Sequence, residues 1–214
     1  MSKELRQRLT MSLLGVVMSG AIVGLFRTAR LGVDPFQSLM SGINAVIPIS
    51  FGTLYMIVNA LLLLFSLLLD RSKIGIATFI NLFLLGYVAE YSEKGLSLVF
   101  PAPSLPLRVL LLCIALVLGC LAAALYFNAN LGVSTYDAVA LVASQRQSRI
   151  PFRLCRILSD LFCVLLGAAL MRLAGYDPGR IWGFIGAGTL ITAFFMGPLI
   201  SLFSAHLPDY TRHA

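Results

Sequence analysis

The stretch LGVDPFQ at residues 31–37 decides how this chain folds, because it returns as LGVSTYD at residues 131–137. Each copy closes a long apolar run with a Leu-Gly-Val turn and then starts a new helix. Asp34-Pro35 combines a favoured helix N-cap with a proline at the first helical position. Ser134-x-x-Asp137 has the spacing of a capping box, and Asp34-x-x-Gln37 is its analogue. The recurrence predicts two related halves, each with a short helix in the same place.

The repeat extends far beyond these two turns. Ile74-Gly75, followed by Thr78 and Gly86, recurs as Ile185-Gly186 with Thr189 and Gly197 at the same spacing. Further matched pairs are Arg8 with Arg108, Phe26 with Tyr126, Ala29 with Ala129, Phe51 with Phe152, Asn59 with Asp160, and Asn81 with Thr192. Chance similarity between apolar helices does not keep glycines and threonines in register. We therefore predict a first half at residues 1–95, a connector at 96–106, a second half at 107–205 and a polar tail at 206–214.

The composition is typical of a membrane protein. Of the 214 residues, 59% are hydrophobic and only 12% are charged, and the mean hydropathy is +0.92. A soluble domain of this size needs far more polar surface. Several apolar runs reach the ~20 residues that cross a bilayer, where backbone groups must be bonded within the chain. They do not alternate as barrel strands do, so the sequence predicts an all-α polytopic membrane protein.

Six long helices and two short ones are expected from the apolar runs. The long ones are predicted at residues 10–28, 51–69, 74–91, 107–127, 152–173 and 181–203, and the short ones at 35–46 and 135–144, with a proline-rich connector at 92–106. The short helices span roughly 18–24 Å, which is less than the bilayer core.

Two topologies are compatible with these segments. If the short helices do not cross, each half has three spans plus a half-helix and the halves are inverted. If they cross, the protein has eight spans and parallel repeats. Ten of the 16 basic residues lie inside in both cases, so the positive-inside rule does not discriminate. Segment length favours six spans with two half-helices.

The charge pattern bears on location and partners. The formal net charge is +7, and basic residues between spans set orientation against an anionic leaflet. We expect a multi-pass protein of the bacterial cytoplasmic (inner) membrane with both termini in the cytoplasm. The first apolar run resembles a signal peptide, but its counterpart deep in the chain indicates a span. The basic residues form no patch with interleaved aromatics, so no nucleic-acid partner is expected. A homo-oligomer is left open.

Groups for covalent or metal chemistry are scarce. No Ser/His/Asp set, HExxH motif or Walker A loop is present. The four cysteines fall in predicted helices with no zinc or haem spacing; they are Cys113, Cys120, Cys155 and Cys163. We expect no enzyme, no cofactor and no metal site. The expected partners are the lipid bilayer and a small-molecule solute.

Three motifs resemble the YitT/YczE family of bacterial integral membrane proteins. They are the turn at residues 31–36, Ser50-Phe51-Gly52-Thr53, and a Gly-x-x-Thr-x-x-Asn-x-x-x-x-Gly helix from Gly75 to Gly86. The resemblance covers nearly the whole membrane region and implies an integral membrane protein and, loosely, transport, without a substrate. The family's aspartate near the aromatic position is Asp137 in the second half but Gln37 in the first, so a charged role does not carry over to Gln37.

The two short helices are the main candidate site. Short helices at matching places in two halves indicate a transporter binding site, with both helix starts facing a shared cavity. The simpler alternative is a pair of short, tilted spans whose acids, Asp34 and Asp137, only cap. Open helix N-termini favour anions. Acids at both starts offset that field and favour a cation or the amine of a zwitterion.

Polar residues inside the long helices add further candidates. Asp160 must pair, become protonated or face a cavity, and Arg156 lies one turn before it. The first half has Tyr55 and Asn59 at these positions, so an internal ion pair is the simpler interpretation. The threonines near Gly75 and Gly186 are explained by hydrogen bonds between closely packed helices. The full set of expected substrate contacts is Asp34, Gln37, Asn59, Asn81, Asp137, Arg156 and Asp160.

These features favour a secondary transporter or exporter of a small polar solute, cationic or zwitterionic, that rocks one half against the other. The alternative is a non-transporting membrane scaffold or an assembly factor for an enzyme complex. An intramembrane enzyme ranks last, because no nucleophile is recognisable.

Overall fold

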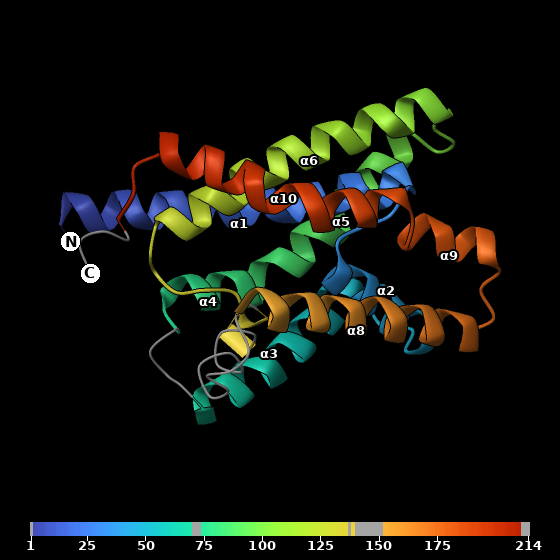
Figure 1. The fold of residues 1–214 in the computed structure, drawn as a ribbon, viewed down its shortest axis with the longest axis horizontal. Helices are drawn as coiled ribbons and strands as arrows, with labels where there is room; N and C mark the ends of the chain where they lie inside the picture. Colours follow the sequence, from blue (N-terminus) through green and yellow to red (C-terminus); the bar gives the residue numbers. More distant parts are fainter. Residues whose placement is uncertain (1, 70–73, 137, 140–151, 211–214) are drawn as a thin grey trace.

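The computed structural model describes residues 2–69, 74–136, 138–139 and 152–210, and every regular element in them is helical. The labelled helices are α1 Lys3–Ala29, α2 Pro35–Val46, α3 Phe51–Leu69, α4 Ile76–Ile80, the π-helical segment η2 Asn81–Leu85, α5 Gly86–Val99, α6 Leu105–Asn128, α8 Phe152–Leu173, α9 Pro178–Phe184 and α10 Ala187–His206 (Figure 1). A further short helix begins at Thr135.

Three predicted helices have the expected bounds, namely α2, α3 and α8. Asp34 is the N-cap of α2, and its Oδ1 accepts a hydrogen bond from the backbone N–H of Gln37 at 3.1 Å. The predicted cap is therefore confirmed. α1 begins earlier than expected because Ser2 caps it, accepting from the N–H of Leu5 at 3.2 Å.

Two predicted boundaries are wrong. The third helix was expected to end at Tyr91, but α5 continues to Val99, and the break between α5 and α6 is only residues 100–104. Prolines lie only at the end of the predicted connector, and Gly95 is tolerated inside the helix. The last helix was expected to be continuous from Ile181, but it is interrupted after Phe184 and restarts at Ala187.

The helices have the length and surface of membrane spans. Within the described residues, four helical segments are long and apolar enough to cross a bilayer: Lys3–Ala29, Phe51–Leu68, Leu105–Asn128 and Pro178–His206. Large apolar side chains stand exposed along them, for example Leu61, Phe65 and Phe194 at 63%, 49% and 75%. A soluble protein does not expose apolar area on this scale, and these helices mark the chain as a membrane protein.

α1 and α6 pack side by side and run antiparallel (Figure 1). Near the start of α1, Arg8 donates from Nε and Nη2 to the carbonyls of Ala129 and Asn130, at 2.9 and 2.5 Å. Near the start of α6, its repeat partner Arg108 donates from the same atoms to Ala29 and Arg30, with the Nε bond at 2.7 Å. Each arginine thus satisfies the free carbonyls at the end of the other helix.

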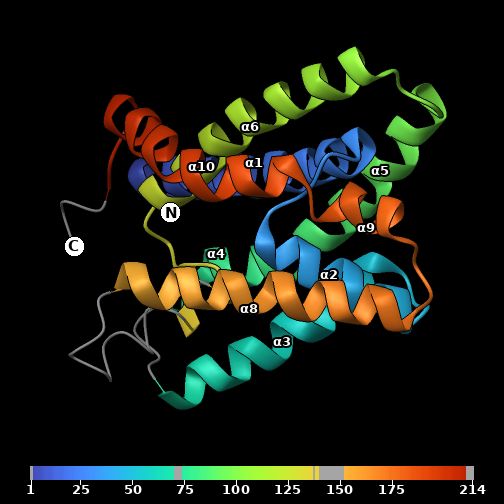
Figure 2. The ribbon, with the colours of Figure 1, turned by 45° about the vertical axis from the view of Figure 1, so that its right-hand side comes forward.

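The remaining helices form two groups around this pair. α5 packs against α1, and α10 packs against α6. On the other side, α2 lies along α8, with α3 next to α2 (Figure 2). The α2–α8 contact is close at two glycines. A Cβ on Gly42 would lie 2.6 Å from the Gly167 carbonyl oxygen, and a Cβ on Gly167 would lie 2.7 Å from that of Ser38.

Candidate functional site

The two Leu-Gly-Val turns have the same backbone conformation. Gly32 and Gly132 have φ of +114° and +115°, and Arg30 and Asn130, two residues earlier, have φ of +51° and +48°. Positive φ favours glycine, which explains why the glycine recurs. In each copy three residues without regular structure, 32–34 and 132–134, lead into a short helix.

Each turn is held by the helix start that carries the other copy of the Gly-x-x-Thr motif. The N–H of Ala77 donates to the carbonyl of Leu131 at 3.0 Å, and the N–H of Gly188 donates to that of Leu31 at 2.6 Å. Thr78 adds a bond from its hydroxyl to the carbonyl of Val133 at 2.8 Å. The bond of Thr78 joins the two copies of the repeat, but its acceptor lies in a turn and not in a second helix as expected.

The same exchange explains the interruption after Phe184. Gly32 and Val33 donate to the carbonyls of Gly183 and Phe184 at 3.1 and 3.0 Å. Gly186 is extended and N-caps α10. A continuous helix would use the carbonyls of Gly183 and Phe184 internally, and they would not be free for the turn.

The two short helix starts meet inside the molecule. The ring of Phe36, in the first turn of α2, stacks on that of Tyr136, in the second short helix, with centroids 4.7 Å apart and an interplanar angle of 23°. These two residues occupy equivalent positions in the repeat. Tyr55 contacts Phe36 edge-on at 6.0 Å. Phe36 and Tyr55 belong to one buried core cluster, and the partly buried Tyr136 packs against it.

Polar side chains from the long helices bind the second short helix beside this stack. The Tyr136 hydroxyl donates to Oδ1 of Asp160 at 2.7 Å and also lies 3.6 Å from Sγ of Cys163. The hydroxyl of Thr135 donates to Oδ1 of Asn59. Asn59 and Asp160 are each the ninth residue of their helix, close to its middle. The predicted pair Asn59 and Asp160 therefore converges on neighbouring residues at mid-length of α3 and α8.

The other described candidates lie close to the same core. Gln37 follows Phe36, is only 4% exposed, and its Oε1 has no hydrogen-bond partner in the described structure. Asn81 is 7% exposed, and its Oδ1 is likewise buried without a partner there. Asn81 opens the π-helical segment η2, a local deviation that is frequent at functional sites. Gly86, behind that segment, packs against Cβ of Tyr55.

Two predicted site residues cannot be placed. Asp137 lies outside the described residues, and so does the side chain of Arg156. The predicted capping role of Asp137 and the predicted ion pair between Arg156 and Asp160 stay predictions.

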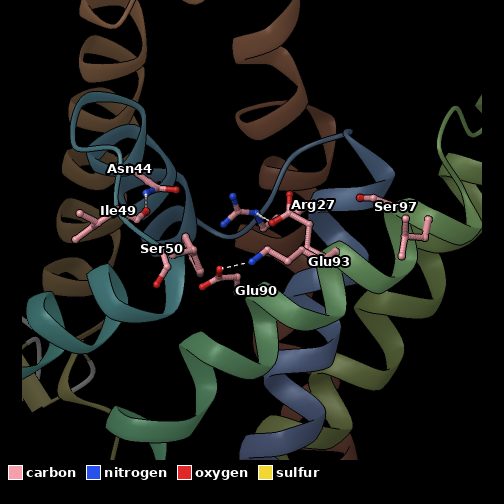
Figure 3. Close-up of a pocket in the computed structure, with 10 residues that line it drawn as sticks. Arg27, Asn44, Ile49, Ser50, Glu90, Glu93 and Ser97 are labelled. Atoms are coloured by element: carbon pink, nitrogen blue, oxygen red, sulfur yellow. Dashed lines mark hydrogen bonds and ion pairs between the residues drawn. The ribbon is translucent and has the colours of Figure 1, made fainter.

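The structure also contains a charged cavity that the sequence did not single out. It has a volume of about 550 Å³ and lies where α1 and α5 approach their C-terminal ends and α3 begins (Figure 3). Arg27 pairs with Glu93, Nε to Oε2 at 2.7 Å, and Lys94 pairs with Glu90 at 2.7 Å. Glu90 also accepts from the N–H of Gly52 at 2.8 Å. The signals in the sequence were the Glu90–Lys94 spacing and charges inside apolar runs.

A chain of aromatic contacts joins this cavity to the central stack. The guanidinium of Arg27 lies over the ring of Phe51, 4.1 Å from its centroid. Phe51 contacts Tyr55 at 6.2 Å, and Tyr55 contacts Phe36. The cavity and the helix starts are therefore neighbouring parts of one region.

Comparisons with known proteins give a family and no relative with an assigned role. The model described as "Family of unknown function (DUF6198)" matches residues 6–205. No curated protein and no solved structure matches the chain. In the described part of the chain, no group of three His, Cys, Asp or Glu side chains is placed to hold a metal ion. The resemblance to the YitT/YczE family stays a prediction.

Proposed function

Because the chain belongs to DUF6198, a family whose function is unknown, we propose from the geometry alone that it is a secondary transporter of a small polar solute. The observation that carries the proposal is the stacking of Phe36 on Tyr136, at the starts of two short helices. Transporters built from inverted repeats commonly place their binding site between two such discontinuous helices.

The topology that fits this proposal has six spans and two half-helices. α2 runs in the same direction as α8, because Phe36 lies near Tyr136 and Cys163 while Gly42 lies against Gly167, further along α8. The chain would thus re-enter the membrane from the side on which α1 ends, turn back at mid-depth, and return as α2 to the same side. The antiparallel α1 and α6, with their exchanged arginine contacts, support two inverted copies.

The side chains at the centre suit a polar solute. Asp160, Asn59 and the hydroxyls of Tyr136 and Thr135 are costly to bury unless they are paired with one another or with a ligand. Two amide oxygens nearby, of Gln37 and Asn81, have no partner in the described structure. An acid and several oxygen acceptors favour a cation or the amine of a zwitterion. In this conformation the aromatic stack occupies the centre, as expected for an occluded state.

Thiol labelling at Phe36 tests the proposal without knowledge of the substrate. In a chain whose four cysteines are replaced by alanine, Phe36→Cys is reconstituted and treated with a membrane-impermeant thiol reagent from one side or the other. If the halves rock, the residue reacts from each side. Leu61→Cys, on the exposed apolar face of α3, is the control and is expected to react from neither.

Labelling of Phe36→Cys from one side only would contradict alternating access. Labelling from neither side would favour the alternative function, a membrane scaffold or an assembly factor whose aromatic core is purely structural.

A further inference from the structure

The charged cavity between α1, α3 and α5 has features of a ligand site. Its 550 Å³ falls within the range of small-molecule pockets. Polar lining comes from Asn44, Ser50 and Ser97, and apolar lining from Ile49, Phe51 and Leu98 (Figure 3). The cavity therefore offers two signs of charge next to an apolar wall.

Arg27 is the residue that points to a ligand. Its side chain is only 9% exposed, its Nε lies 2.7 Å from Oε2 of Glu93, and its guanidinium lies over the face of Phe51. Both Nε and Nη1 are buried without an aligned hydrogen bond in the described structure. A guanidinium has five N–H donors, and leaving one of them buried and unbonded is unfavourable. A carboxylate bound beside Arg27 would supply the missing acceptor once the side chains that cover Nη1 move aside, because carboxylates bind the arginine fork bidentately.

The charges are not needed to pack these helices. In the second copy of the repeat, Arg27 corresponds to Phe127, Glu90 to Ser201 and Glu93 to Ser204. The equivalent helices, α6 and α10, pack against each other without these ion pairs. Only the first copy of the repeat carries these charged residues. We therefore expect them to serve a function that is specific to the first copy.

The balance of charge specifies the ligand. The four charged side chains are Arg27, Lys94, Glu90 and Glu93, and their sum is zero. A lone anion that took Arg27 from Glu93 would leave that carboxylate unpaired, and a lone cation at Glu93 would leave Arg27 unpaired. The loss of its partner would be most costly for Arg27, whose side chain is 9% exposed, and less costly for Glu93, which is 30% exposed. The anionic group of a zwitterion can pair with Arg27 while its cationic group pairs with Glu93. Every charge then keeps a counter-charge.

We propose that this cavity binds a small zwitterion, an α-amino acid with an apolar side chain, through Arg27 at its carboxylate and Glu93 at its ammonium group. The inference rests on the proposed function only for describing the ligand as a transported solute. Ile49, Phe51 and Leu98 would contact the side chain. The aromatic contacts from Phe51 through Tyr55 to Phe36 connect the cavity to the central stack.

Three probes with the same branched side chain test the binding chemistry in the purified full-length protein. They are L-leucine, 4-methylpentanoate, which lacks the amine, and 3-methylbutylamine, which lacks the carboxylate. L-leucine is expected to bind by calorimetry and to raise the melting temperature, and the other two are not. L-alanine is measured beside it to allow for a smaller side chain. Absence of binding by both amino acids, or equal binding of all three leucine-related probes, would overturn the proposal.

Two variants distinguish a binding role from a structural ion pair. Arg27→Gln is expected to weaken amino-acid binding about tenfold to a hundredfold, as for loss of a charge-assisted hydrogen bond. Glu93→Gln leaves Arg27 without a counter-ion and is expected to make 4-methylpentanoate a better ligand than L-leucine. A purely structural pair predicts no change of preference, so an unchanged preference in folded Glu93→Gln protein would contradict the assignment. Asp177→Asn, at the exposed N-cap of α9, is the control.

The same pairing of an oxyanion with an ammonium group occurs in the phosphatidylethanolamine headgroup. Nanodiscs of phosphatidylethanolamine and of phosphatidylglycerol, measured without amino acids, separate this source from a free solute. Stabilisation that appears only in phosphatidylethanolamine and disappears in Arg27→Gln would identify a lipid as the occupant of the site. Labelling of Phe36→Cys from both sides without binding of any zwitterion would leave the transporter proposal intact and remove this one.

Discussion

At the scale of single residues, the glycines of the two Leu-Gly-Val turns carry the contact between the copies of the repeat. A Cβ on Gly132 would lie 2.6 Å from the backbone nitrogen of Gly75, and its φ is +115°. Gly32 has the corresponding surroundings, because a Cβ added there would lie 2.7 Å from the backbone nitrogen of Thr189. These positions therefore need glycine for two separate reasons, backbone conformation and close approach.

Three alanine substitutions separate the two reasons. Gly132→Ala is destabilised both by positive φ and by a steric clash. Gly175→Ala is destabilised by its φ of +82° alone, because nothing lies within 4 Å of the added Cβ. Gly95→Ala meets neither problem. We expect Gly175→Ala to cost about 1–2 kcal/mol, Gly132→Ala to cost more, and Gly95→Ala to stabilise its helix by roughly 0.5–1 kcal/mol. Thermal denaturation in detergent measures all three. Equal stability of Gly132→Ala and Gly95→Ala would contradict the interlocked turns.

At the scale of elements, α2 depends on α8 for its position. Its 12 residues are too few to cross a bilayer, and it lies against α8 at the paired glycines Gly42 and Gly167. Because both backbones touch there, the start of α2 is fixed at the middle of α8, where Tyr136 reaches Asp160.

Enlarging either glycine should push the two helices apart. Gly42→Ala and Gly167→Ala are each expected to cost about 1–3 kcal/mol through overpacking. Since the two residues form one contact, the double variant should cost less than the sum. Gly197→Ala, in α10 with nothing within 4 Å of its Cβ, is the control. Thermal denaturation of the four variants gives the answer, and additive costs would show that the glycines act separately.

Local patterns in the sequence predicted helices but not their tertiary interruptions. α2, α3 and α8 were bounded correctly because caps, prolines and apolar runs are local signals. The break between Phe184 and Ala187 arises from hydrogen bonds to Gly32 and Val33, more than 140 residues away in the chain, which no local pattern contains. The extension of α5 to Val99 was not predicted, because the connector at 92–106 was identified by its prolines and these lie only after Val99.

For the candidate site, the repeat singled out two residues that the structure brings close to each other. Register alone paired Asn59 with Asp160, and the structure places both against the second short helix. The stacking partners Phe36 and Tyr136 were overlooked because aromatic residues in apolar helices carry no distinct signal. Arg27 was missed because its partner Glu93 lies on another helix, so their pairing is tertiary.

At the scale of the whole molecule, the proposed transport mechanism depends on two inverted copies of the repeat. Arg8 and Arg108 bind the ends of the partner helices at opposite ends of the α1–α6 pair. Tyr210, near the end of the described chain, donates from its hydroxyl to Gln7 at 3.2 Å and lies at the start of α1. With six spans, both chain ends lie on one side of the membrane and the loop after α2 lies on the other.

The side of the membrane on which Pro48 lies distinguishes two inverted copies from two parallel ones. In the cysteine-free chain, Pro48→Cys in the exposed loop after α2 and Lys3→Cys at the start of α1 are labelled in intact cells with an impermeant thiol reagent. Two inverted copies with half-helices predict labelling of Pro48→Cys from the outside and protection of Lys3→Cys. Eight spans with parallel repeats put both residues on the same side, and identical labelling of the two would contradict the account.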